Sequence, residues 1–169
     1  MANLGKLLVA AFGALGMIAA GSATGLASDR HDLLEFHSMF GVHGAAVGTV
    51  NHRGITGGGL PWRIASARGE VESYGQVTVQ VKGLVIPVAP FNGTNPVPMF
   101  GATVSCITAH DVVVNVRTGL FPASAAGDST IIDKVTLPSV CNRPILFVTS
   151  PGGAWFARTF LEEGEADGD

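Results

Sequence analysis

Three consecutive glycines, residues 57–59 in the stretch RGITGGGLPWRI, raise the question of a phosphate-binding loop. The backbone N–H groups of such a loop hold a phosphate when a helix follows, in loops that end in Gly-Lys-Ser/Thr or space their glycines as Gly-x-Gly-x-x-Gly. Here Leu60, Pro61 and Trp62 follow the glycines, with strand-like residues beyond them. We therefore interpret the segment as a flexible lead-in to a strand and not as a phosphate site.

Two further groups of residues have types that general acid–base chemistry uses. Glu70 and Glu72 lie two positions apart, so they point to the same side of a strand, as the paired carboxylates of a glycosidase would. That side also carries glutamines and a threonine, which favours simple solvent exposure. His110 and Asp111 offer a base and an orienting carboxylate, but adjacent residues between two strands favour a turn. Because no serine lies in a nucleophile elbow either, the sequence assigns no catalytic residue.

Most of the five histidines lie early in the chain, which raises the question of a metal site. They are His31, His37, His43 and His52. Their spacings of six, six and nine match no ligand pattern on one helix face or strand, so we assign no metal ligand and no cofactor. The alternative that stays open is an extracytoplasmic metal-binding protein or hydrolase that uses these residues together with His110 and Asp111.

The two tryptophans, Trp62 and Trp155, are the best candidates for a binding surface. If both are exposed side by side, they form an aromatic platform for a sugar or a peptide. If both are buried, they anchor the core of a small β-domain, which is the more common use of such residues. We favour the core and keep the platform as the alternative.

The first 27 residues are typical of a secretory signal peptide. A single Lys6 precedes an uncharged apolar run at 7–20, which is short for a membrane span, and small residues follow it. Cleavage is expected after Ala27 or Ala23. The sequence therefore predicts a secreted or otherwise extracytoplasmic protein with no membrane span after cleavage.

Export bears on the two cysteines, Cys106 and Cys141, because disulfides persist outside the cytoplasm. We expect them to pair, which stabilises the fold by about 3 to 4 kcal/mol in the chain-entropy treatment. Five of the 13 acidic residues lie in the last nine positions, LEEGEADGD, which predicts an acidic, disordered tail at 161–169. The rest of the chain carries dispersed arginines, which argues against nucleic acid as a partner.

Alternating hydrophobicity predicts a β-hairpin in ARGEVESYGQVTVQVKG, residues 67–83. A three-residue loop at 73–75, with Gly75 in the left-handed conformation, sets Val71 opposite Val77. This register turns Ala67, Val71, Val77, Val79 and Val81 inward and Glu70, Glu72, Gln76 and Gln80 outward. Extended backward, it turns Trp62 outward, so we expect a bulge between residues 65 and 69 or burial of both faces there.

Further strands are predicted at 100–107, 112–116, 129–137, 145–148 and 154–160. Together they indicate an all-β domain at 53–160, an antiparallel β-sandwich of about 7–8 strands, immunoglobulin-like or a related barrel, with one disulfide. Residues 28–52 form an N-terminal arm, either a short helix through Leu33, Phe36 and Phe40 or a disordered segment.

Several stretches resemble a group of uncharacterised secreted bacterial proteins, namely GGGLPW, ARGEV, NPVPMFGATVSC, FPASAAGDS and VTLPSVCNRPILFVTSPGGAWFA. The resemblance covers most of the chain after about Gly54 and implies export and one bacterial domain that contains both cysteines. It implies no activity. We therefore expect a non-catalytic exported module with a structural or binding role, whose partner is an envelope or extracellular protein or a glycan.

Overall fold

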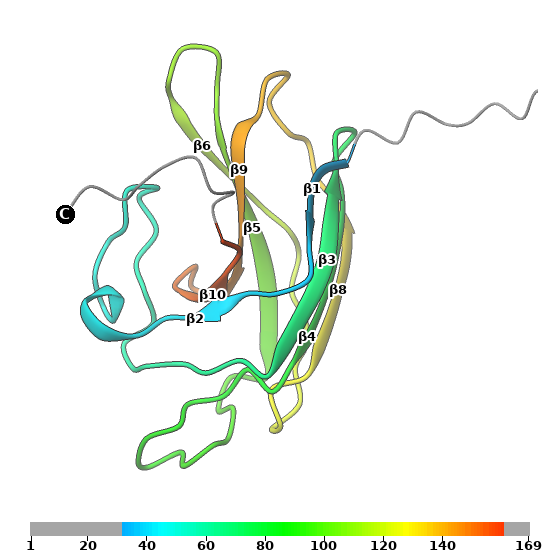
Figure 1. Ribbon diagram of the computed structural model, residues 1–169. Coiled ribbons are helices and arrows are strands. Elements are labelled where there is room, and N and C mark those ends of the chain that lie inside the picture. The colour runs from blue at the N-terminus through cyan, green and yellow to red at the C-terminus, as the bar shows by residue number, and fades with distance from the viewer. Residues whose placement is uncertain (1–31, 161–169) are drawn as a thin grey trace, which may run out of the picture.

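The computed structural model describes residues 32–160. The expected signal peptide (1–27) and acidic tail (161–169) lie outside the described residues. Two antiparallel sheets face each other, and ten strands and one three-residue 3-10 helix, η1 (Gly44–Ala46), make up the regular structure of the described part (Figure 1). The predicted antiparallel β-sandwich is confirmed.

The first sheet has the strand order β1-β3-β4-β8. Its strands are β1 (Asp32–Phe36), β3 (Ser66–Glu72), β4 (Gln76–Lys82) and β8 (Ser129–Lys134). The second sheet has the order β2-β10-β9-β5-β6. Its strands are β2 (Phe40–Gly41), β10 (Trp155–Arg158), β9 (Asn142–Thr149), β5 (Met99–Ile107) and β6 (Val113–Arg117), and β7 (Phe121–Pro122) pairs with the start of β5. Eight strands have four or more residues, and β2 and β7 have two each.

The β3–β4 hairpin has the predicted register, in which Val71 pairs with Val77 and Gly69 with Val79. Gly75 has the predicted positive φ, at 91°. All five residues expected to point inward are buried. The strand pattern of the sequence and its turn residues therefore determine this hairpin locally.

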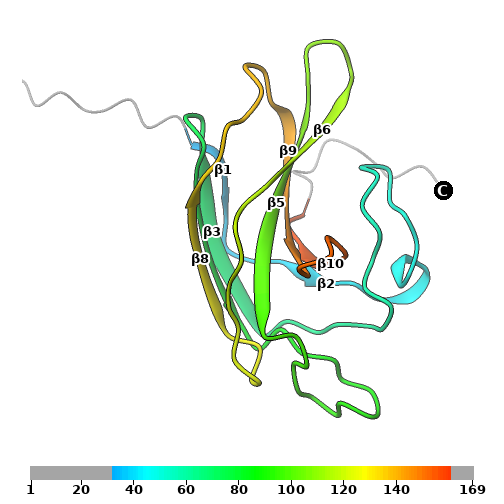
Figure 2. The ribbon, with the colours of Figure 1, turned by 180° about the vertical axis from the view of Figure 1, so that it is seen from behind.

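The other predicted strands correspond to β5, β6, β8, β9 and β10, with ends that differ by up to three residues. β9 is an interior strand, as its apolar run ILFV predicts. β5 is also buried on both faces from Phe100 to Cys106. The reason is an outer layer: residues 42–58 lie on the side of the second sheet that faces away from the first sheet (Figures 1 and 2).

The N-terminal arm is neither a helix nor disordered after residue 31. Asp32–Phe36 forms β1, which pairs with β3 so that Glu35 lies opposite Glu70 and Phe36 opposite Gly69. Leu34 and Phe36 are buried in the core, as alternation in a strand requires. Long-range pairing with β3 overrides the helical spacing, and the sandwich therefore includes residues that precede position 53.

Two of the three glycines in the run, Gly57 and Gly58, are buried and packed tightly, so they are not a flexible lead-in, whereas Gly59 is exposed. A Cβ on Gly57 would collide with the carbonyl of Ala46, and one on Gly58 would lie 2.9 Å from the indole nitrogen of Trp62. Gly57 and Gly58 therefore allow neighbouring segments to approach closely.

The position of Trp62 has neither of the two expected explanations, a bulge or burial of a strand on both faces. β3 begins only at Ser66, so Trp62 precedes the strand, and Arg63 forms an isolated bridge with Val85.

Candidate functional site

The predicted acidic pair lies on the outer face of the first sheet, but its two members differ in exposure. Glu70 is half-buried, whereas Glu72 is only 5% exposed, so the expected solvent exposure is wrong for Glu72. The physical reason is β1, an additional strand that pairs with β3 and places Asp32 opposite Glu72. Within residues 32–160, the Oε2 atom of Glu72 has no hydrogen-bond partner.

The histidines of the described region are exposed and lie on separate segments. His37 follows β1, with its Nε2 atom 3.6 Å from Glu35, and His43 precedes η1. His52 lies in the outer layer, and His110 lies with Asp111 in the turn between β5 and β6. His31 is outside the described residues. No group of three or more His, Cys, Asp or Glu side chains suited to a metal ion occurs in residues 32–160.

The two tryptophans do not form an exposed platform. Trp62 is 5% exposed and Trp155 is 2% exposed. Trp62 stacks on Phe156, with ring centroids 3.9 Å apart, whereas Trp155 lies edge-on to Phe147 at 5.9 Å. Both tryptophans therefore pack in the core, as the favoured interpretation predicts, and Trp62 and Trp155 do not form a binding surface.

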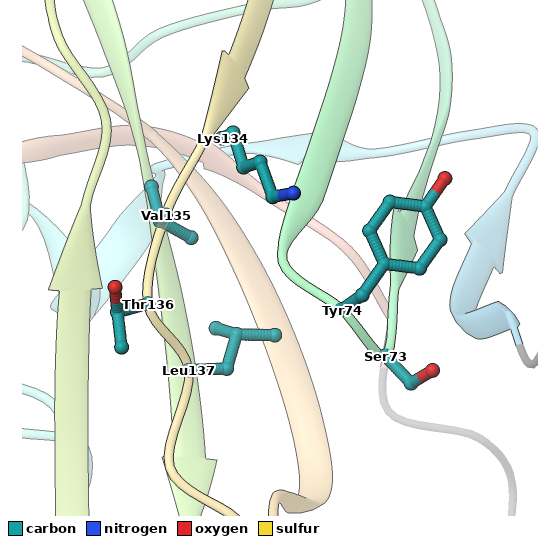
Figure 3. A pocket seen from close by; sticks show the side chains of 6 residues that line it. All are labelled: Ser73, Tyr74, Lys134, Val135, Thr136 and Leu137. Carbon is teal, nitrogen blue, oxygen red and sulfur yellow. The ribbon is translucent and has the colours of Figure 1, made fainter.

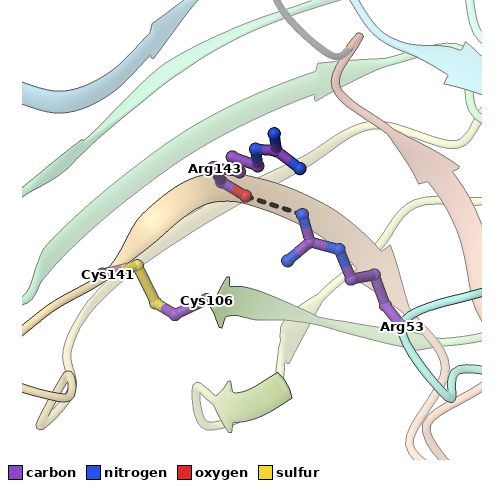
Figure 4. The surroundings of a disulfide bond; sticks show 4 residues. All are labelled: Arg53, Cys106, Cys141 and Arg143. Carbon is purple, nitrogen blue, oxygen red and sulfur yellow. Dashed lines mark hydrogen bonds between the residues drawn. A yellow bond between two sulfur atoms is a disulfide. The ribbon is translucent and has the colours of Figure 1, made fainter. Parts of the chain in front are cut away.

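The predicted disulfide between Cys106 and Cys141 is present, with Cα atoms 4.6 Å apart (Figure 4). It ties the linker that precedes β9 to the end of β5. On the outer face of the same sheet, Arg53 accepts a hydrogen bond from Asn115 of β6 through its carbonyl and donates one from Nη2 to the carbonyl of Arg143 in β9 (2.9 Å). Arg53 therefore fastens the outer layer to two strands of the second sheet, β6 and β9, which lie on either side of β5.

An open groove of about 530 Å³ lies at the end of the first sheet where the β3–β4 loop meets the segment after β8 (Figure 3). It is lined by Ser73, Tyr74, Lys134, Val135, Thr136 and Leu137. Tyr74 is the single tyrosine of the chain and is 54% exposed. The Nζ atom of Lys134 lies 5.5 Å from the centre of the Tyr74 ring, a cation–π distance.

Backbone pairing positions both sides of this groove. Gln76, the first residue of β4, lies opposite Lys134 in β8, which brings the β3–β4 loop beside the end of β8. Beyond the strand, Val135 donates its N–H to the carbonyl of Gly75 at 2.9 Å. The backbones that carry Tyr74 and Lys134 are thus held side by side.

The groove belongs to a larger end of the sandwich, which we call the disulfide end: the loops at 73–75, 108–112 and 135–141. Strand pairing places all three together, because Gln76 lies opposite Lys134 and Ile107 opposite Asn142. Val112 in the second loop is 55% exposed and Val140 in the third is 37% exposed. Neither valine lines the groove, so the groove itself is the candidate binding site at this end.

Sequence reasoning missed this groove, since Tyr74 and Lys134 are distant in the chain and follow no spacing rule. The available signal was an aromatic residue at the tip of a predicted hairpin.

Comparisons with protein-family models, with curated proteins and with solved structures find no match for this chain. No helix formed by residues 32–160 has the length and hydrophobicity to cross a membrane.

Proposed function

We propose that the chain is an exported, non-catalytic β-sandwich module that binds an acidic saccharide of the cell envelope or extracellular space in the Tyr74–Lys134 groove. The observation that carries the proposal is the exposed Tyr74 ring beside the Lys134 ammonium group in an open groove. The Cys106–Cys141 bond is compatible with the extracytoplasmic location that the proposal requires.

The chemistry of the groove fits such a ligand. An exposed aromatic ring offers a flat apolar surface on which the C–H face of a sugar packs, and its rigidity keeps the entropic cost of binding low. The Lys134 ammonium group pairs with a carboxylate on the sugar, and the hydroxyls of Ser73 and Thr136 donate to or accept from ring hydroxyls. The openness of the groove suits a chain that continues past it at both ends.

The openness also sets the expected strength of binding. An exposed ion pair contributes about 1 kcal/mol or less, so the preference for an acidic over a neutral sugar should be several-fold and should shrink as salt is added. Most of the affinity must come from the ring. Tyr74→Ala should therefore weaken binding more than Lys134→Gln does.

The test uses tetragalacturonate as an acidic probe and cellotetraose as a neutral one, each titrated into the ¹⁵N-labelled protein. Tetragalacturonate should shift the amide signals of residues 73–75 and 134–137. Tyr74→Ala should abolish these shifts, Tyr74→Phe should retain them, and Lys134→Gln should remove the preference over cellotetraose. Ile132→Ala, a substitution of another exposed side chain of β8, serves as the control. Shifts that survive Tyr74→Ala, or none with either probe, would contradict the proposal.

A further inference from the structure

β6 (Val113–Arg117) lies at the edge of the second sheet, where among the described strands it pairs only with β5. The β5–β6 hairpin projects beyond the body of the sandwich in both views (Figures 1 and 2). The sequence from 112 to 116 is VVVNV, so this edge is apolar, and Val112 and Val113 are 55% and 37% exposed. An exposed, apolar edge strand is a template for pairing with another strand.

The other three sheet edges carry features that prevent such pairing. β1 contains charged Asp32 and Glu35 and a register irregularity between Asp32 and Leu34. β8 is approached by the chain at Gly119, whose N–H donates to Asp133 at 2.7 Å. β2 is only two residues long. Proteins protect exposed edges in these ways, and β6 carries none of these features within residues 32–160, so it is the edge best suited to pair with another strand.

The backbone groups that β6 offers follow from its hydrogen bonds to β5. The N–H of Thr118 donates to the carbonyl of Ala102, and the N–H of Thr108 donates to the carbonyl of Val112. Because hydrogen-bonded and non-bonded pairs alternate in an antiparallel ladder, the even-numbered residues of β6 bond to β5. The N–H and C=O groups of Val113, Asn115 and Arg117 therefore point to the free edge.

We propose that this edge pairs with β6 of a second copy of the chain, antiparallel and centred on Val114. In that register Val112 lies opposite Val116 of the second copy and Val113 opposite Asn115. Odd-numbered residues then lie opposite odd-numbered residues and even-numbered opposite even-numbered. The N–H and C=O groups that point to the free edge of one copy therefore face those of the other. Two sandwiches would share one continuous sheet across a two-fold axis.

Charge favours this register over its neighbours. Asp111 lies in the turn before β6, and Arg117, whose Nη2 donates to the carbonyls of Ser150 and Pro151, ends the strand. Centring on Val114 brings the acid of each copy to the end of β6 that carries Arg117 in the other. Moving the centre to Val113 or to Asn115 sets both charges beside uncharged residues. The valines of the two copies would also cover one another, since Val114 and Val116 are only partly buried within one chain.

The first test is the concentration dependence of mass for the full-length mature protein, measured by sedimentation equilibrium. The proposal expects a reversible dimer. Val114→Lys sets two ammonium groups face to face across the axis and should raise the dimer dissociation constant at least about tenfold. Ile132→Lys, on the outer face of the first sheet, should leave it unchanged. A monomer at every soluble concentration, or a dimer that Val114→Lys does not weaken, overturns the proposal.

Two further readouts test the register. Amide exchange followed by NMR should show that the N–H groups of Val113 and Asn115 are protected only in the dimer, whereas those of Val114 and Val116 are protected in the monomer as well. Val112→Cys and Val116→Cys chains, mixed and oxidised, should crosslink to each other, because non-bonded antiparallel pairs have Cα atoms about 4.5 Å apart. Each variant alone should crosslink poorly. Equal crosslinking of like and unlike chains, or dimer protection elsewhere than β6, overturns this pairing.

Discussion

Thr149 lies directly opposite Trp155 in the ladder between β9 and β10, and both side chains are buried. Neither the Thr149 hydroxyl nor the indole N–H of Trp155 has a hydrogen-bond partner within the described part of the chain. The hydroxyl of Thr159, in contrast, has a partner, because it accepts a hydrogen bond from the N–H of Leu146 at 3.2 Å. Two buried threonines, one at the end of β9 and one just after β10, therefore differ in whether the side-chain oxygen has a hydrogen-bond partner.

This difference predicts opposite effects of the same substitution. A buried hydroxyl without a partner costs about 1 kcal/mol or more, so Thr149→Val should leave the free energy of unfolding unchanged or raise it by about 1 kcal/mol. Thr159→Val removes the acceptor of a buried N–H and should lower it by about 1 to 3 kcal/mol. Urea denaturation of the two variants measures both values. Equal destabilisation would show that Thr149 is satisfied in solution.

The β3–β4 hairpin could be predicted to the residue because its information is local. Side chains alternate with period two, so only one register keeps Val71, Val77 and Val79 on one face, and Gly75 supplies the turn. β1 could not be predicted in this way. Leu33, Phe36 and Phe40 fit helical spacing, whereas Leu34 and Phe36 fit a strand, and only pairing with β3 decides between them.

The candidate site lay beyond prediction for a related reason. Tyr74 and Lys134 become neighbours through the pairing of Gln76 with Lys134, a contact between strands far apart in the chain. Both strands are predictable from their alternating residues, but their order in the sheet is not, because a single sequence does not specify which strands pair. Glu72 illustrates the same point, because its burial depends on β1 as an additional strand beside β3.

Removing the disulfide should cost stability. Cys106 and Cys141 are separated by 35 positions, for which the chain-entropy treatment gives about 3 to 4 kcal/mol. The Cys106→Ala/Cys141→Ala double variant should lose this amount in urea denaturation, and reduction of the unaltered protein should have a similar effect. The variant should also exchange amide protons faster at 135–141, since the bond fastens that linker to β5. A variant as stable as the disulfide-bonded protein would contradict the prediction.

Asp128 predicts a dependence of stability on pH. A hydrogen bond from the N–H of Gly83 (3.0 Å) and the ammonium group of Lys82 (3.2 Å) lower the pKa of Asp128 below its ordinary value of 3.8. A carboxyl whose pKa is lower in the folded than in the unfolded chain stabilises the fold above its ordinary pKa. This contribution is lost as the pH falls through the folded value.

Asp128→Asn should therefore reduce the free energy of unfolding at neutral pH and lose this effect in acid. The side chain of Asp128 is 41% exposed, so water screens the interaction and the difference should stay below about 1 kcal/mol. Denaturation of both proteins from neutral pH down to about pH 2 checks the sign, since the difference must narrow below the ordinary pKa of the carboxyl. A difference that widens in acid would contradict the assigned cause.

Gly75 and Gly93 form a matched pair that separates backbone strain from steric collision. Their φ angles are 91° and 93°, so alanine is strained at both positions, by about 1 to 2 kcal/mol. A Cβ on Gly93 meets nothing within 4 Å, whereas one on Gly75 collides with the carbonyl of Val135. Gly93→Ala should therefore show the strain alone.

Gly75→Ala should show the strain together with the displacement of Val135, whose N–H donates to the Gly75 carbonyl at 2.9 Å. We expect it to lower the free energy of unfolding by at least about 1 kcal/mol more than Gly93→Ala does, because a backbone hydrogen bond is disturbed as well. Urea denaturation measures the difference. Since Val135 lines the groove, Gly75→Ala should also reduce the shifts that tetragalacturonate causes, and Gly93→Ala should not. Equal losses in the free energy of unfolding for the two variants would mean that the β3–β4 loop can move away from the segment after β8 without penalty. The two sides of the groove would then not be fixed relative to each other.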